Sequence, residues 1–156
     1  PRSASAIRRL NKAGIPVLVV HNAAAVCRNL CSLSRVIELD EKMKELLAKE
    51  SAYVDAILFC PHHPEAFNPS FAYNCSWRKP GTGMLEFLAG IFRFDLKKSY
   101  VVGDSYRDII MGQTMGAKTI ALRTGHAVAD GPMTRSPDHW AENLWEAVNI
   151  ILREVE

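Results

Sequence analysis

The segment from residue 60 to residue 79 holds the side chains whose types and spacing best suit metal chemistry. Cys60 and His62 are separated by one residue, and Cys75 follows at the far end of the same loop. Thiolates and imidazole nitrogens are the usual zinc ligands, and a structural zinc site normally has four of them. The spacing offers no evident fourth ligand. Two interpretations are therefore open: a three-ligand zinc site, or a loop that keeps its shape without metal.

Two carboxylates and one lysine form a second group of residues suited to chemistry. Asp104 directly follows the apolar run that ends at Gly103, and Asp108 lies four residues later. Carboxylates at the carboxyl end of a parallel strand are suited to Mg²⁺, which prefers oxygen ligands. Asp108 has an equally good alternative role as a cap at the start of a helix. Lys79, which precedes Pro80, is a cation on a constrained loop that could reach an anion.

Apolar periodicity divides the chain into alternating strands and helices that must position these groups. Short apolar runs typical of buried strands occupy residues 16–20, 55–59, 99–102 and 118–122. Segments with helical periodicity occupy residues 5–13, 39–53, 83–92, 107–115 and 144–155. The alternation predicts βαβ units with a Rossmann-like parallel sheet flanked by helices, in a single α/β domain over residues 1–156.

Composition excludes several classes of protein. The net charge is +2, and no run of lysine and arginine suggests nucleic-acid binding. The four cysteines are too few and too unevenly spaced for a disulfide scaffold, which predicts an intracellular, reducing compartment without naming an organelle. The apolar runs are far shorter than a membrane span.

Several motifs together resemble the haloacid dehalogenase (HAD) superfamily of phosphatases. They are Asn22 at a strand end, RKP at residues 78–80 and GDSYRD at residues 103–108. CPHHPE at residues 60–65, with the returning Cys75, is similar to D-glycero-D-manno-heptose 1,7-bisphosphate phosphatases and to histidinol-phosphate phosphatases. The resemblance extends over nearly the whole chain and implies a HAD-like fold.

The resemblance also implies roles for individual residues. Members of the family transfer a phosphoryl group to an aspartate with the help of Mg²⁺, and then hydrolyse the aspartyl phosphate. By resemblance, Lys79 is the catalytic lysine, Asp104 and Asp108 hold magnesium, Asn22, Arg28 and Arg78 contact substrate, and Cys60, His62 and Cys75 bind zinc. The family's fourth zinc ligand is replaced by Trp77, whose indole cannot bind zinc.

The sequence departs from the family pattern at its catalytic centre. The family's first motif, DxDGT, supplies the nucleophile, but no Asp-x-Asp occurs in this sequence. The second motif, typically Thr-Asn-Gln, is replaced by His21, Asn22 and Ala23. Combined with Trp77, these losses predict a degenerate domain that is catalytically inactive, so that the chain is an enzyme only under the alternative interpretation. Its expected role is structural, as an assembly subunit of a large complex such as an organellar ribosome.

Two other interpretations stay open. One is an active phosphatase whose nucleophile motif lies upstream of Pro1, which fits a chain that begins without methionine. The other is a phosphate-sensing module that uses Lys79 and Arg28 without turnover. In the family the strand that carries the first motif lies in the middle of the sheet. Its loss would leave two strands with unpaired backbone groups, which is costly. We therefore expect an upstream segment or a protein partner to complete the sheet.

Overall fold

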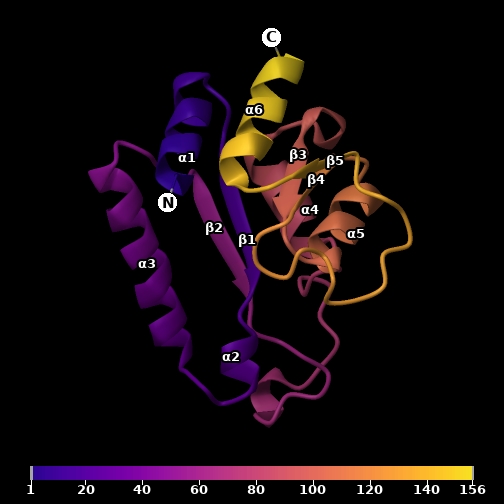
Figure 1. Cartoon of the computed structure of the whole chain (residues 1–156). Coiled ribbons are helices and arrows are strands. Elements are labelled where there is room, and N and C mark those ends of the chain that lie inside the picture. Colours follow the sequence, from indigo (N-terminus) through magenta and orange to yellow (C-terminus); the bar gives the residue numbers. More distant parts are fainter. Residues whose placement is uncertain (1, 156) are drawn as a thin grey trace.

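The computed structural model describes residues 2–155 and consists of parallel strands flanked by helices (Figure 1). The helices are α1 (Ser3–Lys12), α2 (Ala24–Cys27), α3 (Leu33–Lys49), α4 (Gly83–Phe92), α5 (Tyr106–Thr114) and α6 (Leu144–Val155). The strands are β1 (Leu18–Asn22), β2 (Ala56–Cys60), β3 (Tyr100–Gly103), β4 (Lys118–Leu122) and β5 (His139–Ala141). Two short 3-10 helices, η1 (Pro69–Phe71) and η2 (Leu96–Lys98), lie in the connections. The expected α/β HAD-like class is confirmed.

The strands form two separate parallel sheets. In the first sheet β1 pairs with β2, and Leu18 is opposite Ala56. In the second sheet the order is β3-β4-β5, with Tyr100 opposite Lys118 and Ile120 opposite His139. We call these the two-stranded sheet and the three-stranded sheet. The chain crosses from one to the other through the loop after β2 and α4.

A shared apolar cluster holds the two sheets in place. Ala6 and Leu10 of α1 pack against Ala147 and Val148 of α6, and Ile120 of β4 lies in the same cluster. Partly buried residues from both sheets line it, including those that lead into β1 and those of β3. Figure 1 shows α1 and α6 side by side, α3 beside β2, and α5 beside the three-stranded sheet.

Several helix ends follow from local sequence. Ser32 begins α3, and its hydroxyl accepts a hydrogen bond from the amide of Arg35 at 3.2 Å. Ser105 and Asp108 form a reciprocal capping box at the start of α5. Gly14 ends the turn after α1 with φ of +70°, a conformation that glycine adopts without steric cost.

The expected elements are present, with shifted ends in places. The segments 83–92, 118–122 and 144–155 match their elements, whereas β1 and β3 end one or two residues later than predicted. The predicted start of the helix at residue 39 is wrong, because the Ser32 cap starts α3 at Leu33. The sequence gave no signal for α2 and β5, which are too short to show periodicity. Within residues 2–155, no helix is long and apolar enough to cross a membrane.

Candidate active site and metal cluster

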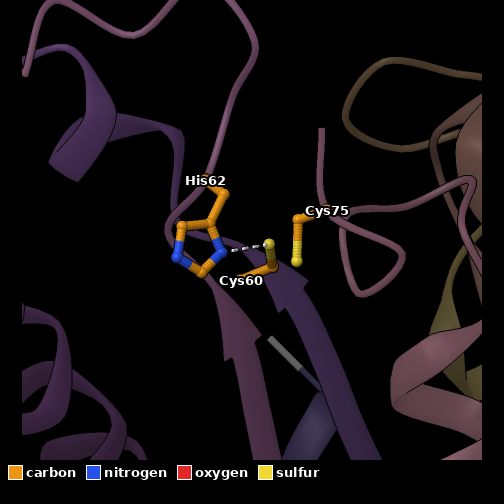
Figure 2. Close-up of side chains that lie close together, drawn as sticks. All are labelled: Cys60, His62 and Cys75. Atoms are coloured by element: carbon orange, nitrogen blue, oxygen red, sulfur yellow. Dashed lines mark hydrogen bonds between the residues drawn. The ribbon is translucent and has the colours of Figure 1, made fainter. Parts of the chain in front are cut away.

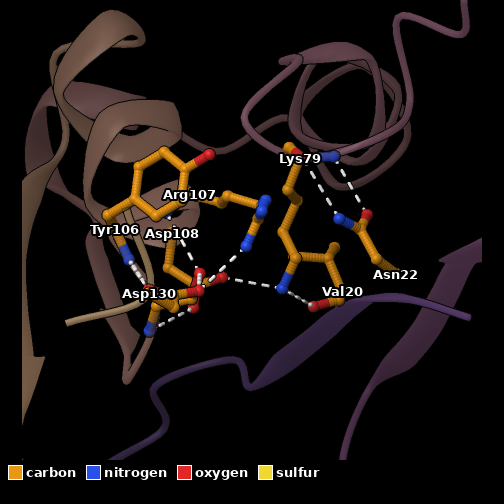
Figure 3. Close-up of polar contacts among 8 residues, drawn as sticks. Val20, Asn22, Lys79, Tyr106, Arg107, Asp108 and Asp130 are labelled. Atoms are coloured by element: carbon orange, nitrogen blue, oxygen red, sulfur yellow. Dashed lines mark hydrogen bonds and ion pairs between the residues drawn. The ribbon is translucent and has the colours of Figure 1, made fainter. Parts of the chain in front are cut away.

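Lys79 lies where the carboxyl ends of β1 and β3 come together. Its ammonium nitrogen donates to the carbonyl of Val20 in β1 at 2.9 Å and to Oδ1 of Asp108 at 2.7 Å (Figure 3). The side chains of Lys79 and Asp108 are only 12% and 10% exposed, so water screens their attraction weakly. The lysine expected at a phosphate site is therefore held rigidly between the two sheets.

Asn22 fixes the backbone of the loop that carries Lys79. Its amide nitrogen donates to the Lys79 carbonyl at 3.1 Å, and its Oδ1 accepts from the Lys79 amide at 3.0 Å (Figure 3). This two-point contact joins the end of β1 to a residue far away in the sequence. Asn22, which we expected to contact substrate, thus orients the lysine.

The two carboxylates after β3 occupy different environments. Both oxygens of Asp108 are engaged, Oδ1 by Lys79 and Oδ2 by the amide of Ser105 at 3.2 Å. Asp104 accepts the amide of His126 through Oδ2 at 2.9 Å, and no other hydrogen bond to it occurs within residues 2–155. A Cβ at Gly125 would lie 1.9 Å from the same Oδ2, so this turn requires glycine. Of the pair, Asp104 has the oxygen that is free to bind a cation.

Asp130 organises the start of α5 and was not singled out from the sequence. Its carboxylate accepts from Ser105 Oγ at 2.7 Å, from the Tyr106 amide at 3.0 Å and from Arg107 Nη1 at 2.8 Å. Burial opposes ionisation of Asp130, but these hydrogen bonds and the Arg107 charge outweigh it, so the pKa of Asp130 lies below its usual value. An Asp-Gly turn far from α5 gives no sequence signal for this contact.

An open cavity of about 460 Å³ lies beside Lys79. Its lining residues are His63, Pro64, Asn74, Cys75, Ser76, Arg78, Lys79, Pro80 and Arg107. Three of them are basic and none is acidic, so the cavity is suited to an anion. Arg78 donates to the carbonyl of His62 at 3.0 Å, and burial, with Arg107 and Arg28 nearby, lowers its pKa. Arg28 itself is exposed at the end of α2.

Cys60, His62 and Cys75 converge as the sequence predicts. One ligand atom from each lies within 4.8 Å of the other two, and Cys60 Sγ is 3.5 Å from His62 Nδ1 (Figure 2). Ligand atoms of a tetrahedral zinc are about 3.5–3.8 Å apart, so the trio fits zinc. Burial and the neighbouring Cys75 raise the pKa of Cys60 to about 11, and burial lowers the pKa of His62.

The other ring nitrogen of His62 is also engaged. Tyr73 Oη lies 2.6 Å from His62 Nε2, and the two rings pack at 4.2 Å. This contact turns Nδ1 of His62 toward the thiols. Neighbours of this kind orient metal-binding histidines in many sites.

Trp77 lies away from the trio, against α4. Its ring packs on Phe87 at 5.3 Å, and a Cβ at Gly83 would lie 2.6 Å from its ring. No fourth Cys, His, Asp or Glu joins the cluster among the described residues. His21, in the second motif, contacts Asp40 of α3 at 3.2 Å and packs on Phe59, so it is already engaged away from Lys79.

Comparison with known proteins identifies relatives over most of the chain. The HAD-hydrolase-like family model matches residues 76–147. The D-glycero-D-manno-heptose-1,7-bisphosphate 7-phosphatase of Thermosynechococcus vestitus is 36% identical over 97% of this chain and 81% of its own. That of Escherichia coli is 31% identical over 88% and 72%, respectively. The relative from Rhodopseudomonas palustris is 37% identical, and the match spans 64% of its length.

A solved structure agrees with these relatives. The D,D-heptose 1,7-bisphosphate phosphatase of B. bronchiseptica, complexed with magnesium and phosphate, superposes with a TM-score of 0.86. It is 30% identical, and the match covers 99% of this chain and 83% of that one.

These relatives correct the expectation of an inactive structural domain. Proteins that match most of the chain carry the names of phosphatases, so the interpretation as a non-enzyme is wrong and the alternative, an active phosphatase, is better supported. The expectation relied on substitutions that the structure accommodates: Trp77 packs on α4, and Asn22 still orients Lys79. The expected place in a large assembly followed from inactivity and loses its basis.

The motifs, the fold and the relatives lead to the same family. Lys79 is held at the strand ends, the GDSYRD segment opens α5, and the CPHHPE loop brings its cysteines and histidine together. The chain belongs to the HAD-like hydrolases and, within them, to the family of the D-glycero-D-manno-heptose-1,7-bisphosphate 7-phosphatases.

Proposed function

We propose that the protein is a magnesium-dependent phosphatase that acts on a heptose bisphosphate, with a nucleophilic aspartate contributed by residues that precede Pro1. The observation that carries the proposal is the Lys79 ammonium, fixed by Val20 and Asp108 beside a cavity whose charged lining residues are all basic. The names of the relatives supply the substrate class.

The residues of this chain account for the electrostatic part of the reaction. A carboxylate attacks a phosphate monoester only when positive charge offsets the repulsion between the two anions. Lys79 supplies that charge next to the transferred phosphate, while Arg78 and Arg107 attract the rest of a doubly phosphorylated substrate into the cavity. Asn22 and Asp108 keep the lysine in place, so little reorganisation is needed during the reaction.

Asp104 is the residue best placed to hold magnesium. Its second oxygen is free within residues 2–155, whereas both oxygens of Asp108 are occupied. Magnesium often binds through one or two carboxylates together with water and substrate phosphate, which fits a single available aspartate. When bound, the ion would add positive charge at the transferred phosphate.

We also infer that the loop cluster binds zinc through Cys60, His62 and Cys75, with water at the fourth position. The three ligand atoms already lie at the spacing that zinc needs, and Tyr73 fixes the histidine ring. Zinc would fasten the loop between β2 and α4, since Arg78 and Lys79 follow shortly after Cys75. Its role is structural and separate from phosphate transfer.

The experiment measures orthophosphate release by the full-length polypeptide, including the residues that precede Pro1. We expect Mg²⁺-dependent hydrolysis of D-glycero-D-manno-heptose 1,7-bisphosphate, with much slower hydrolysis of heptose 1-phosphate because the second phosphate lacks its partner in the cavity. Treatment with EDTA should abolish turnover. Binding of the bisphosphate without phosphate release would contradict the proposal and favour a sensing module instead.

A further inference from the structure

The two sheets run in the same direction and flank a gap that no described strand fills. Their carboxyl ends meet at Lys79, which contacts both Val20 of β1 and Asp108 just after β3 (Figure 3). Near their amino ends both border the apolar cluster of α1 and α6, to which Val17 and Tyr100 contribute. Nevertheless, β1 and β3 belong to different sheets, and within residues 2–155 no ladder joins them.

The pairing pattern shows which backbone groups face the gap. In a parallel strand the N–H and C=O of one residue point to the same side, and successive residues alternate sides. Val17 and Ala23 bond to the β2 side, so the odd residues of β1 face β2, and Leu18, Val20 and Asn22 face away. Ser99 bonds to Lys118, so by the same alternation the groups of Tyr100 and Val102 face away from β4.

These outward groups lack a strand partner. Of them, only the Val20 carbonyl has a hydrogen bond within the described chain, and its donor is the Lys79 side chain. Burial agrees: β4, which is paired on both sides, buries Thr119, Ile120 and Ala121, whereas every residue of β1 is half-exposed. A single strand carries N–H and C=O groups on both sides and could therefore satisfy both edges at once.

Chain topology favours one source for this strand. Helix α1 precedes β1, packs against α6 and runs opposite to β1 (Figure 1). A strand in the gap followed by α1 and then β1 makes a βαβ unit, and strands joined in this way are usually neighbours in a parallel sheet. The B. bronchiseptica structure also has 17% of its length outside the superposition, enough chain for a strand and its loops.

We propose that the gap is a preformed acceptor for one parallel strand, and that the segment preceding Pro1 in the full-length polypeptide fills it. Its carboxyl end then lies at Lys79, where an acidic residue that follows the strand would meet the ammonium. Only that acidic residue rests on the proposed phosphatase function; the strand itself rests on the free edges of β1 and β3.

Amide hydrogen exchange tests the strand directly. We compare residues 1–156 with the full-length polypeptide and follow the amides of Val20 and Val102, which face the gap. The amides of Val19 and Val101 face β2 and β4 and serve as internal controls. We expect at least 100-fold slower exchange of Val20 and Val102 in the longer polypeptide, with a smaller change at the controls. Equal exchange of Val20 and Val102 in the two polypeptides would overturn the proposal.

A matched pair of proline variants gives a second test. Val20→Pro removes an amide that faces the gap, and Val19→Pro removes one that bonds to β2. In residues 1–156 we expect a clearly larger drop in melting temperature for Val19→Pro than for Val20→Pro. In the full-length polypeptide the two drops should be similar, because both amides are then in ladders. A difference that persists unchanged in the longer polypeptide would contradict the proposal.

The outcomes separate the strand from the phosphatase function. Protection of Val20 and Val102 without phosphate release means that the strand is present and the proposed function fails. Phosphate release without that protection means that the nucleophile reaches Lys79 from elsewhere and the acceptor proposal fails. Protection that requires a second protein in addition to the full-length chain would likewise overturn the assignment to the preceding segment.

Discussion

The two halves of the molecule differ in how completely they are packed. Around the three-stranded sheet, Ile109, Met111, Ile120 and Val148 are fully or almost fully buried. Around the two-stranded sheet, all of β1 is half-exposed, and α3 leaves Ile37 and Leu46 more than half exposed. One half is a finished core, and the other is a thin layer.

Chemical side chains are concentrated in the thinner half. The zinc trio follows β2, and Asn22 at the end of β1 orients Lys79. The three-stranded sheet contributes Asp104 and Asp108 at its rim, and Asp108 reaches across to the lysine. The well-packed half thus provides a rigid base, whereas the thin half depends on Lys79, on the loop and on whatever fills the gap.

Removal of Lys79 should have the largest effect, because it contacts both halves. In the full-length polypeptide, Lys79→Met should lower kcat/KM by about 10³-fold, since the transition state loses a preorganised cation. Stability should fall by about 3 kcal/mol because Asp108 stays buried without a partner. Phosphate-release kinetics and urea denaturation measure the two effects.

A double variant separates these effects of Lys79. Lys79→Met combined with Asp108→Asn removes the uncompensated charge, so most of the stability should return while activity stays low. Lys42→Met, which breaks an exposed pair with Glu45, is the matched control and should change stability by less than about 1 kcal/mol. Recovery of activity in the double variant would show that Lys79 acts only through Asp108.

Matched core truncations compare the two halves directly. Ile120→Ala in β4, at 0% exposure, should cost about 2–5 kcal/mol, because it leaves a cavity in a closed core. Ile57→Ala in β2, which is half-exposed, should cost clearly less because water already reaches the site. Denaturation midpoints measure both, and equal losses would mean that the two halves are packed alike.

The sequence predicts what depends on local spacing. The pattern of Cys60 and His62, and the apolar run of β4, need only near neighbours, and both appear as expected. Contacts between distant segments escape such reasoning: Asp130 reaches back to Arg107, and Lys79 pairs with Asp108 although the sequence suggested Asp104 as its partner. Partner choice there is set by tertiary packing.

Tyr73 should tune the metal cluster of the thinner half. Tyr73→Phe removes the hydroxyl that orients His62, so the dissociation constant for zinc should rise about 10–100-fold. Competition with a chromogenic chelator measures the affinity. Tyr53→Phe, at an exposed tyrosine away from the cluster, should leave it unchanged. Unchanged affinity in Tyr73→Phe would mean that the loop alone positions the histidine.

The smallest effect should come from Glu154, which ties α6 to the three-stranded sheet. Its carboxylate meets Lys118 Nζ at 2.7 Å, Tyr100 Oη at 2.6 Å and His139 Nε2 at 2.8 Å. The hydrogen bond from Lys118 is the largest cause that lowers the pKa of Glu154, from 4.5 to about 2. Because the folded-state pKa is the lower one, the contribution is complete above about pH 5 and is lost as the pH falls toward 2.

Glu154→Gln isolates this contribution. The wild type should be slightly more stable than the variant at pH 7, and the difference in unfolding free energy should shrink between pH 5 and pH 2. Added salt should reduce the difference at pH 7, because the group is partly exposed and screened. Glu38→Gln, in an exposed pair with Arg35, is the control and should show a smaller pH dependence. A wild-type advantage that persists at pH 2 would mean that Glu154 stabilises the finished half through packing, because its charge is gone at that pH.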